Sequence, residues 1–432
     1  MKDSTPMRDY TRKAIRGTIV HAPCFGRVEV LPRGYIVVDE RGIIEGVYSE
    51  KEYERGLELV YDFDNKLILQ AMCDMHTHAP QYPMMGLGLD EPLMSWLQTY
   101  TYPQEARFQN QKYAVDTYRA FASAMAEAGT TRACVFGTVH VDATMQLMAA
   151  MQNKGLSGYV GKVNMDRNCP DELRETADSS IEETLRWLDL CQFISGVKPI
   201  ITPRFTPACT RDLMNRLGDI VAEDNLPVQS HISESVEEMF TAGQLEPNSR
   251  GYWDTYLQPG LWNDKTLMAH CIWSDEDEMR RMHEFGVTAV HCPTSNLNLS
   301  SGMCDVRKLL NRGVKVVLGS DVGAGHTLNM LDVMASAIQV SKEVSRRQGL
   351  RDPLSTEEVY YLATSAAQEY FGDKPGFAPG NEFHAIVLDD MWLQDSNFLS
   401  PVERLQRALY QRDPNWLVKS FAGPRIIYDR GF

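Results

Sequence analysis

Hydrophobic and polar positions follow two different patterns along the chain. Over residues 15–69, short apolar stretches alternate with turn residues, most clearly Pro-Arg-Gly at 32–34 and Glu-Arg-Gly at 40–42. This pattern predicts a small all-β region. Two similar stretches return near the C-terminus, at 382–388 and 424–429. The strands expected in the N-terminal region have the sequences AIRGTIVH, RVEVL, GYIVVDE, IIEGVYS and KLILQ.

Between the two ends, apolar stretches alternate with segments of helical period. The segment after Asn110, a typical N-cap residue, places apolar residues three or four positions apart, and Gly129 provides a stop signal. Continuous apolar strands between amphipathic helices are typical of a parallel sheet that is buried on both faces. Eight apolar runs occur, at residues 72–76, 131–136, 157–164, 197–202, 226–231, 266–270, 287–291 and 314–321.

Eight strand and helix units predict an α/β fold of the (β/α)₈ type, a TIM barrel. We expect this barrel to span residues 71–371 as the catalytic domain. Residues 1–70 plus 372–432 are expected to form a composite, small β-sandwich domain from both chain ends. A length of 432 residues suggests about two or three domains, and one large barrel with one small domain accounts for it.

Net charge and cysteine content narrow the range of partners. Asp and Glu outnumber Lys and Arg by 58 to 43, and the net charge is −15. Such a chain repels polyanions, which argues against nucleic acids and anionic membranes as partners. The nine cysteines are odd in number and form no Cys-x-x-Cys pair, so we expect reduced thiols. Because the N-terminal stretch is polar and no apolar run reaches about 18 residues, the pattern predicts a cytoplasmic protein.

Five of the ten histidines stand at the ends of predicted strands. Active sites of (β/α)₈ barrels lie at these ends. In the sequence His76-Thr77-His78 the two imidazoles project to the same face of a strand, so both can reach one ion. Taken singly, each histidine is better explained as a hydrogen-bonded core or surface residue, whereas together they favour a metal site. The other residues at strand ends are His231, His270, His291 and Asp321.

Imidazoles suit Zn²⁺ and Fe²⁺, and a carboxylate such as Asp321 completes a site that leaves one position for water. Glu234 follows His231 by three residues, where a carboxyl group can move protons between that water and a substrate. The alternative is that Glu234 is only an acidic residue favoured in the first turn of a helix. His270 either polarises the water or is a further ligand, and the spacing alone does not decide between them.

Motifs of other enzyme classes are absent from the sequence. It contains no G-x-x-x-x-G-K-[ST] phosphate loop, no full G-x-G-x-x-G and no G-x-S-x-G. It also lacks the His-x-Glu and Pro-Cys-x-x-Cys pair of the other class of zinc deaminases.

A series of motifs from about residue 74 to residue 388 resembles the amidohydrolase superfamily. In chain order the motifs are DMHTHAPQY, WLQTYTYPQEARFQN, TPRF, SHISE, AHCIW, HCPTSNLNLSSG and GSDVGAG. Within the superfamily, HAPQY, WLxxYTxPxEARF and TPRF are similar to the guanine deaminase branch. One departure is Gln-Ala-Met-Cys at residues 70–73, where the superfamily usually has a Pro-Gly turn. This departure concerns the local backbone shape and not the metal ligands.

The resemblance implies a metal-dependent hydrolase of amidohydrolase type. It implies Zn²⁺ as the cofactor, one ion per subunit, with Fe²⁺ as the alternative. The implied metal ligands are His76, His78, His231 and Asp321. The implied catalytic residues are Glu234 as a proton shuttle, His270 as a partner of the hydrolytic water and Asp321 as acceptor of its proton.

The substrate implied by the resemblance is guanine, which reacts with water to give xanthine and ammonia in purine catabolism or salvage. Zinc-bound hydroxide attacks C2 while Glu234 protonates N3 and then helps the amino group to leave. Arg204 offers donors to the O6 carbonyl, Gln81 can donate and accept along a ring edge, and Phe205 presents an aromatic face. The implied substrate-binding residues are Gln81, Arg204, Phe205, His231, Glu234 and Asp321, and the implied assembly is a homodimer.

The sequence leaves two kinds of alternative open. A sister amidohydrolase that acts on an oxidised guanine, a pterin or a triazine would share most motifs, and a non-catalytic barrel used for binding is a less favoured alternative.

The connection at residues 79–110 is long and apolar for a βα loop, which predicts a cover over the substrate or part of a subunit interface. Packing onto the barrel explains it equally well.

Overall fold

The computed structural model describes residues 12–53, 58–391, 398–411 and 415–431. Contacts divide the chain into two compact units, Met1–Met72 with Thr356–Phe432, and Cys73–Ser355. The domain boundaries expected from the sequence, after residues 70 and 371, stay predictions. Within the described ranges, none of the helices is long and apolar enough to cross a membrane.

The larger unit is built on short strands that pair in parallel. One row of paired strands contains β5, β6, β7 and β9, and a second contains β11, β12, β13 and β14. The parallel bridge between Ile201 and Val228 connects the two rows at one side. At the other side, the amide of Asp321 donates to the carbonyl of His76 at 2.8 Å, which closes the barrel. The strands are β5 (Met72–His78), β6 (Thr130–Phe136), β7 (Ser157–Gly161), β8 (Val163–Asn164), β9 (Val197–Pro199), β10 (Thr202–Pro203), β11 (Val228–Ile232), β12 (Thr266–His270), β13 (Thr288–His291) and β14 (Lys315–Leu318).

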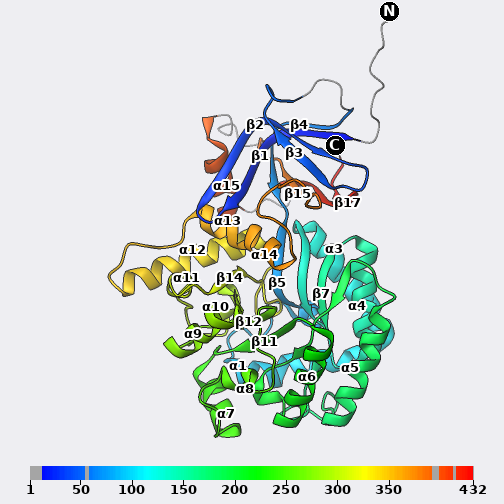
Figure 1. The fold of residues 1–432 in the computed structure, drawn as a ribbon, viewed down its shortest axis with the longest axis vertical. Helices are drawn as coiled ribbons and strands as arrows, with labels where there is room; N and C mark the ends of the chain where they lie inside the picture. Colours follow the sequence, from blue (N-terminus) through cyan, green and yellow to red (C-terminus); the bar gives the residue numbers. More distant parts are fainter. Residues whose placement is uncertain (1–11, 54–57, 392–397, 412–414, 432) are drawn as a thin grey trace, which may run out of the picture. The chain divides into compact units, whose positions relative to one another are not determined.

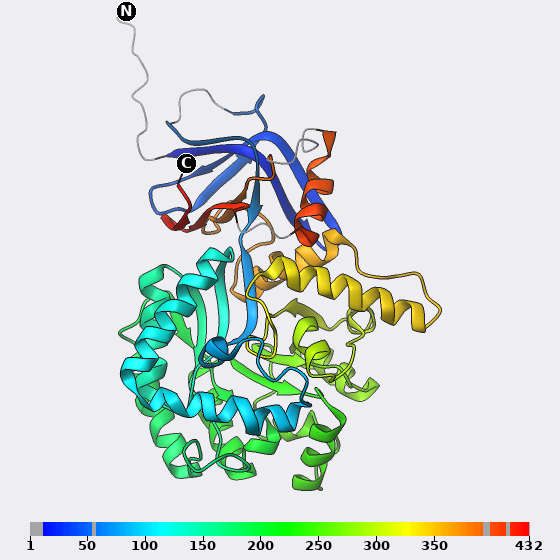
Figure 2. The same cartoon turned by 180° about the vertical axis from the view of Figure 1, so that it is seen from behind.

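Helices cover the outer side of these strands (Figures 1 and 2). In α3, Asn110 caps the first turn by accepting from the amides of Lys112 and Tyr113, and buried apolar residues recur along one face as the sequence predicts. The buried strands and surrounding helices confirm the predicted α/β class. The helices are α3 (Gln111–Glu127), α4 (Val141–Lys154), α5 (Ala177–Cys191), α6 (Arg211–Asp224), α7 (Val236–Leu245), α8 (Asp254–Leu257), α9 (Glu276–Phe285), α10 (Pro293–Asn298), α11 (Val306–Asn311) and α12 (Met330–Arg347).

The long connection after β5 folds into a chain of short helices. Its apolar side chains, Leu93, Trp96, Leu97 and Tyr102 among them, share one buried cluster with Phe205 and other barrel residues. The connection therefore packs onto the barrel, and its additional role as a cover or subunit interface stays a prediction. Its helices are η1 (Ala79–Met84), α1 (Leu93–Trp96), η2 (Leu97–Thr101), α2 (Tyr102–Ala106) and η3 (Arg107–Gln109).

The smaller unit contains one sheet in the order β17-β16-β15-β4-β1-β2-β3. Segments from both chain ends meet where β15 pairs with β4, as expected of a composite β domain. The strands form one hydrogen-bonded sheet, and register shifts in the long strands β1 and β4 let it bend around its own core. Its strands are β1 (Lys13–Cys24), β2 (Arg27–Val38), β3 (Ile44–Tyr48), β4 (Glu58–Gln70), β15 (His384–Leu388), β16 (Leu417–Ala422) and β17 (Arg425–Asp429), and its helices are α13 (Thr356–Ala363), α14 (Ser365–Tyr370) and α15 (Pro401–Tyr410).

One predicted turn is wrong. Residues 32–34 lie inside β2, which pairs with β1 on both sides of them. The register shifts between Gly17 and Ile19, and Arg33 has a φ of 52°, so the Pro-Arg-Gly signal marks a β-bulge within one strand.

Gln70 explains the departure from the usual Pro-Gly turn. Its amide oxygen accepts from the amide of Ala22 at 2.7 Å, and its amide nitrogen donates to Ser365 and Gln368 at 2.9 Å each. The buried glutamine thus connects β4, β1 and α14 by hydrogen bonds that a Pro-Gly pair cannot make.

Candidate active site

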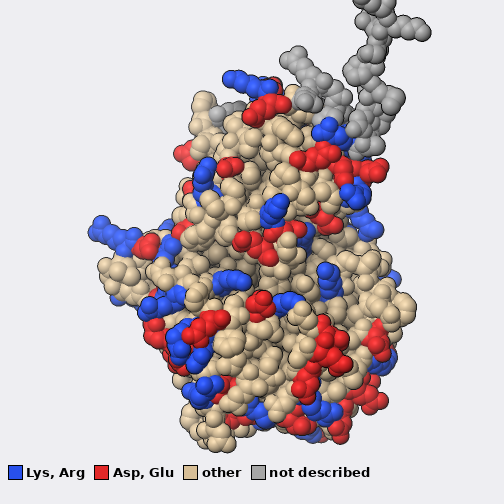
Figure 3. Space-filling view, viewed as in Figure 1, with Lys and Arg blue, Asp and Glu red and all other residues tan. Residues whose placement is uncertain are grey.

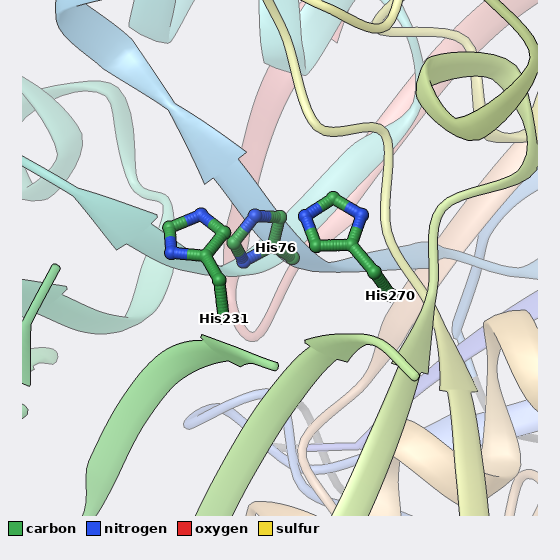
Figure 4. Close-up of side chains that lie close together, drawn as sticks. All are labelled: His76, His231 and His270. Atoms are coloured by element: carbon green, nitrogen blue, oxygen red, sulfur yellow. The ribbon is translucent and has the colours of Figure 1, made fainter. Parts of the chain in front are cut away.

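The strand ends of the barrel bring the predicted metal ligands into one cluster. His76 and His78 lie on β5, His231 on β11, and Asp321 follows β14. One carboxylate oxygen of Asp321 lies 3.2 Å from Nε2 of His76 and 3.3 Å from Nε2 of His78. Figure 4 shows the rings of His76, His231 and His270 turned toward one another from three separate strands.

The orientation of His231 is fixed by the backbone. Its Nδ1 lies 2.6 Å from the carbonyl oxygen of Arg204, which can only accept, so Nδ1 carries the proton. Nε2 therefore presents a lone pair, and it points at Nε2 of His78, 3.2 Å away. This arrangement is typical of metal-binding histidines, whose second nitrogen is held by a hydrogen bond.

Burial keeps the histidines of the cluster neutral. It lowers the pKa of His76, lowers that of His78 to about 4 and holds that of His231 well below its usual range. Burial opposes the ionisation of Asp321, but the contacts with His76 and His78 hold its pKa well below the ordinary value. Neutral imidazoles and an ionised carboxylate are the protonation states that metal binding requires.

The residues present fit a divalent metal ion. The ligand atoms of His76, His78 and Asp321 lie within 4.8 Å of one another, and so do those of His76, His231 and His270. Nε2 of His76 is buried and has no partner with hydrogen-bond geometry among the described residues. A cation that takes up these lone pairs removes the cost of leaving buried nitrogen atoms unpaired.

Asp74, on β5, holds in place the loop after β14, which carries Asp321. Its carboxylate accepts from the amide of Ser320 at 2.9 Å and from the Ser320 hydroxyl at 2.5 Å, one residue before Asp321. Burial raises the pKa of Asp74 to about 7. Asp321 itself has a φ of 49° and His270 a φ of 76°. Such left-handed residues are held in place by their surroundings, and here they turn both side chains away from the strand direction into the cluster.

Glu234 lies beside this cluster, one residue before the N-cap Ser235 of α7. One carboxylate oxygen lies 3.4 Å from Nε2 of His270, and the other accepts from the Ser301 hydroxyl at 3.2 Å. Burial raises the pKa of Glu234 to about 8, and the nearby charge of Asp321 adds to this rise. A carboxyl group that holds a proton near neutral pH is suited to general acid and base work. The amide of Glu234 donates to Glu238 at 2.8 Å, which fixes the backbone.

One cavity is lined by the predicted substrate residues together with His78, His231 and Asp321 of the cluster. Arg204 and Phe205 follow β10, and Gln81 lies on η1, directly after the two histidines of β5. Leu93, Trp96 and Leu97 of the long connection form an apolar wall, which suits a flat ring. The cavity is lined by His78, Gln81, Leu93, Trp96, Leu97, Arg204, Phe205, His231, Glu234, His270, Leu299, Asp321 and Ala324.

Sequence reasoning missed three residues of this site. Glu105 bonds to both Arg204 and Gln81. Phe136, at the end of β6, packs its ring against the imidazoles of the cluster, with ring centroids 4.5 Å apart for His78. Asn296 lies 2.9 Å from Nδ1 of His270. Glu105 and Asn296 stand inside motifs that resemble the family, but no spacing rule indicates which side chains they contact.

His291 ends β13 but belongs to neither group of metal-binding atoms. Its side chain is 1% exposed, and neither ring nitrogen has a hydrogen-bond partner among the described residues. Burial lowers its pKa to about 3.

We expect His291 to make the fold sensitive to acid. Its folded-state pKa lies below the ordinary value of 6.5, so the unfolded chain binds more protons and stability falls as the pH drops from 6.5 toward 3. Between pH 6.5 and 5 this group alone costs about 2 kcal/mol. His291→Leu should remove that part of the pH dependence, measured by urea unfolding at pH 7 and pH 5. His326→Leu, at an exposed position, is the control; an equal response of both variants would contradict the assignment.

Comparisons with known proteins agree with this geometry. The profile of the Amidohydrolase family matches residues 67–413, and the chain belongs to this family of metal-dependent hydrolases. The guanine deaminase of Dictyostelium discoideum is 35% identical over 407 residues, covering 89% of this chain and 90% of its own. The guanine deaminase of Escherichia coli (strain K12) is 34% identical over 380 residues, covering 86% and 85%. A guanine deaminase structure from C. acetobutylicum, with guanine bound in the active site, matches at a TM-score of 0.92 and 40% identity, covering 96% of this chain and all of the other.

Proposed function

We infer that this protein is a guanine deaminase, which hydrolyses guanine to xanthine and ammonia. The observation that carries this inference is that Gln81, Arg204 and Phe205 line the same cavity as His78, His231 and Asp321 of the cluster. The similarity to guanine deaminases over most of the chain, one of them with guanine bound, supports the same substrate.

For the cofactor we propose Zn²⁺, with Fe²⁺ as the alternative. The residues that would hold it are His76, His78, His231 and Asp321, whose nitrogen and oxygen atoms suit either ion. When bound, the ion supplies an acidified water at neutral pH and so makes a strong nucleophile available.

The recognition residues hold the purine ring in register with this water. Arg204 donates to the O6 carbonyl, because its guanidinium offers several donors and lines the cavity. Gln81 offers one N–H and one lone pair of its side-chain amide to one edge of the guanine ring. Phe205 offers an aromatic face, and the apolar wall formed by Leu93, Trp96 and Leu97 excludes bulk water from the ring.

Glu234 moves the protons. In its protonated form it donates to N3 of guanine, which makes C2 more electrophilic. It then takes the proton of the hydroxyl group added at C2, as the C2 carbonyl forms, and delivers that proton to the departing amino group. His270, 3.4 Å from Glu234 and 3.9 Å from Asp321, orients the attacking water between these two carboxylates. Asp321 is ionised at the start, accepts the proton that the water loses and later passes it on to restore the protonated form of Glu234.

Substrate choice and metal dependence can be tested together. We expect purified protein to release ammonia from guanine faster than from an oxidised guanine, a pterin or a triazine, followed by ultraviolet absorbance. A chelator should abolish this activity, and Zn²⁺ or Fe²⁺ added back one at a time should show which ion restores it. Faster turnover of another ring would identify a sister amidohydrolase. Absence of stoichiometric metal and of activity on every ring would favour a binding protein.

We also propose a cytoplasmic homodimer. None of the nine cysteines forms a disulfide bond, and eight of them are buried, which suits a reducing compartment. Figure 3 shows acidic and basic side chains interspersed on one face, which agrees with a small, neutral substrate better than with a polyanion. Sedimentation of the purified protein measures the assembly directly.

A further inference from the structure

Glu105 is a buried carboxylate to which the proposed reaction gives no task. It lies on α2, in the connection after β5, and is 1% exposed. One oxygen accepts from Nη1 of Arg204 at 2.7 Å, and the other accepts from Nε2 of Gln81 at 2.9 Å. A single side chain therefore bridges the two polar residues that line the substrate cavity.

The bridge decides which way the Gln81 amide points. A carboxylate only accepts, so the side of Gln81 that faces Glu105 must be its NH₂ group. On the opposite side, the amide oxygen accepts from the backbone amide of Gly323 at 3.2 Å. These two bonds leave one N–H and one lone pair of Gln81 for a ligand. The donor and the acceptor therefore have fixed positions along the edge of a ligand ring.

The bridge also decides how Arg204 is held. Its guanidinium is 3% exposed and lies 5.2 Å from the centroid of the Tyr102 ring. Among the described residues, its one side-chain hydrogen bond is the bond to Glu105. The remaining donors are free to meet a ligand carbonyl. Glu105 also balances the charge of Arg204, which would otherwise stand uncompensated in a buried cavity beside a metal cation.

We propose that Glu105 is a positioning residue that sets substrate specificity. It holds Arg204 and Gln81 in one arrangement that matches a ring bearing a carbonyl next to an N–H edge. Rings without that carbonyl gain nothing from this arrangement. The proposal rests on guanine deamination as the proposed function and adds the residue that organises recognition.

The test compares guanine with 2-aminopurine, a ring that has the reacting amino group but lacks the O6 carbonyl. In Glu105→Gln we expect the KM for guanine to rise about ten- to hundredfold, because a charge-assisted bond and the order of the Gln81 amide are lost. The kcat should change less. The preference of kcat/KM for guanine over 2-aminopurine should fall about tenfold or more. Metal content should equal that of the unchanged protein.

Glu175→Gln is the matched control. Glu175 pairs with buried Lys162 at 2.6 Å in the same unit but does not line the cavity. Loss of the Glu175 charge should lower the unfolding temperature. The KM for guanine and the preference of kcat/KM for guanine over 2-aminopurine should not change. A general structural defect would lower kcat/KM equally for guanine and for 2-aminopurine. The ratio of the two kcat/KM values therefore separates a positioning role from a folding role.

Glu105→Asp is the second variant, for the case in which Glu105→Gln does not fold. It keeps the charge but is one methylene shorter and cannot reach both partners, so the same loss of preference is expected. An unchanged KM and preference in a folded variant overturn the proposal for Glu105 alone. Failure of both variants to fold overturns it as well, because Glu105 is then a folding requirement. If the unchanged protein does not deaminate guanine, the proposed function fails and this proposal fails with it.

Discussion

Replacing Glu234 by Gln is expected to leave a folded, metal-loaded protein that has lost guanine turnover by about 10²- to 10⁴-fold. The amide keeps the size of the carboxyl group and can still contact Ser301 and His270, which lie 3.2 and 3.4 Å from Glu234. It cannot take up and release a proton, however, so protonation of N3 and departure of the amino group both lose their donor. Single-turnover rates and metal analysis of the same preparation measure the two effects separately.

The neighbouring Glu237→Gln is the matched control for this experiment. Glu237 stands in the first turn of α7, three residues after Glu234, but is exposed, so its substitution removes an acidic residue near the helix N-terminus without touching the cavity. Turnover near that of the unchanged protein is expected. If Glu234→Gln behaved like this control, the first-turn explanation of Glu234 would be right and its catalytic role would be wrong.

Asp321→Asn should remove the metal and the activity together, with a loss of about 10³-fold or more. Asp321 is the carboxylate of the cluster and contacts His76 and His78 through one oxygen, at 3.2 and 3.3 Å. A neutral amide offers no negative charge to a cation and can place an N–H against it. Metal content by mass spectrometry and turnover with added Zn²⁺ give the two measurements.

Asp305→Asn serves as its control because an amide can replace this carboxylate. Asp305 caps α11 by accepting from the amide of Lys308 at 3.0 Å, and Asn is an equally good cap. We expect full metal content and activity. If Asp321→Asn kept its metal, Asp321 would not be a metal ligand.

The eight barrel strands could be predicted because apolar runs and helical periods repeat along the chain. The runs at 266–270 and 287–291 coincide with β12 and β13 to within one residue. These strands are recognisable in the sequence because strands buried on both faces must be apolar throughout. The histidines at their ends then indicated the cluster, because parallel strands end on the same side of a barrel.

Elements of the small unit were harder to predict. A bulge and a turn use the same residues, so residues 32–34 alone could not show that β2 continues through them. β16 and α15 were missed. For α15 a signal was present, since Ser400 and Glu403 form a capping box around Pro401.

Glu105 marks the limit of sequence reasoning in the site. Its partner Arg204 stands 99 positions further along the chain. No period or motif relates two residues at that distance, because their contact depends on how the connection after β5 folds onto the barrel. The sequence therefore predicted Gln81 and Arg204, which line the cavity, but not the carboxylate that bridges them.

The pairing of β4 with β15 sets an order of events during synthesis of the chain on the ribosome. β4 appears early, but its partner follows only about 300 residues later, a delay of about 15 to 60 s at bacterial or eukaryotic elongation rates. Throughout that time Leu67, Ile68 and Leu69, which are fully buried in the finished protein, lie along an open strand edge. Residues 73–355 have all been made before the edge is covered. The unit that contains β4 is thus the last that can finish folding, although much of it is made before residues 73–355, and until then it needs protection from aggregation.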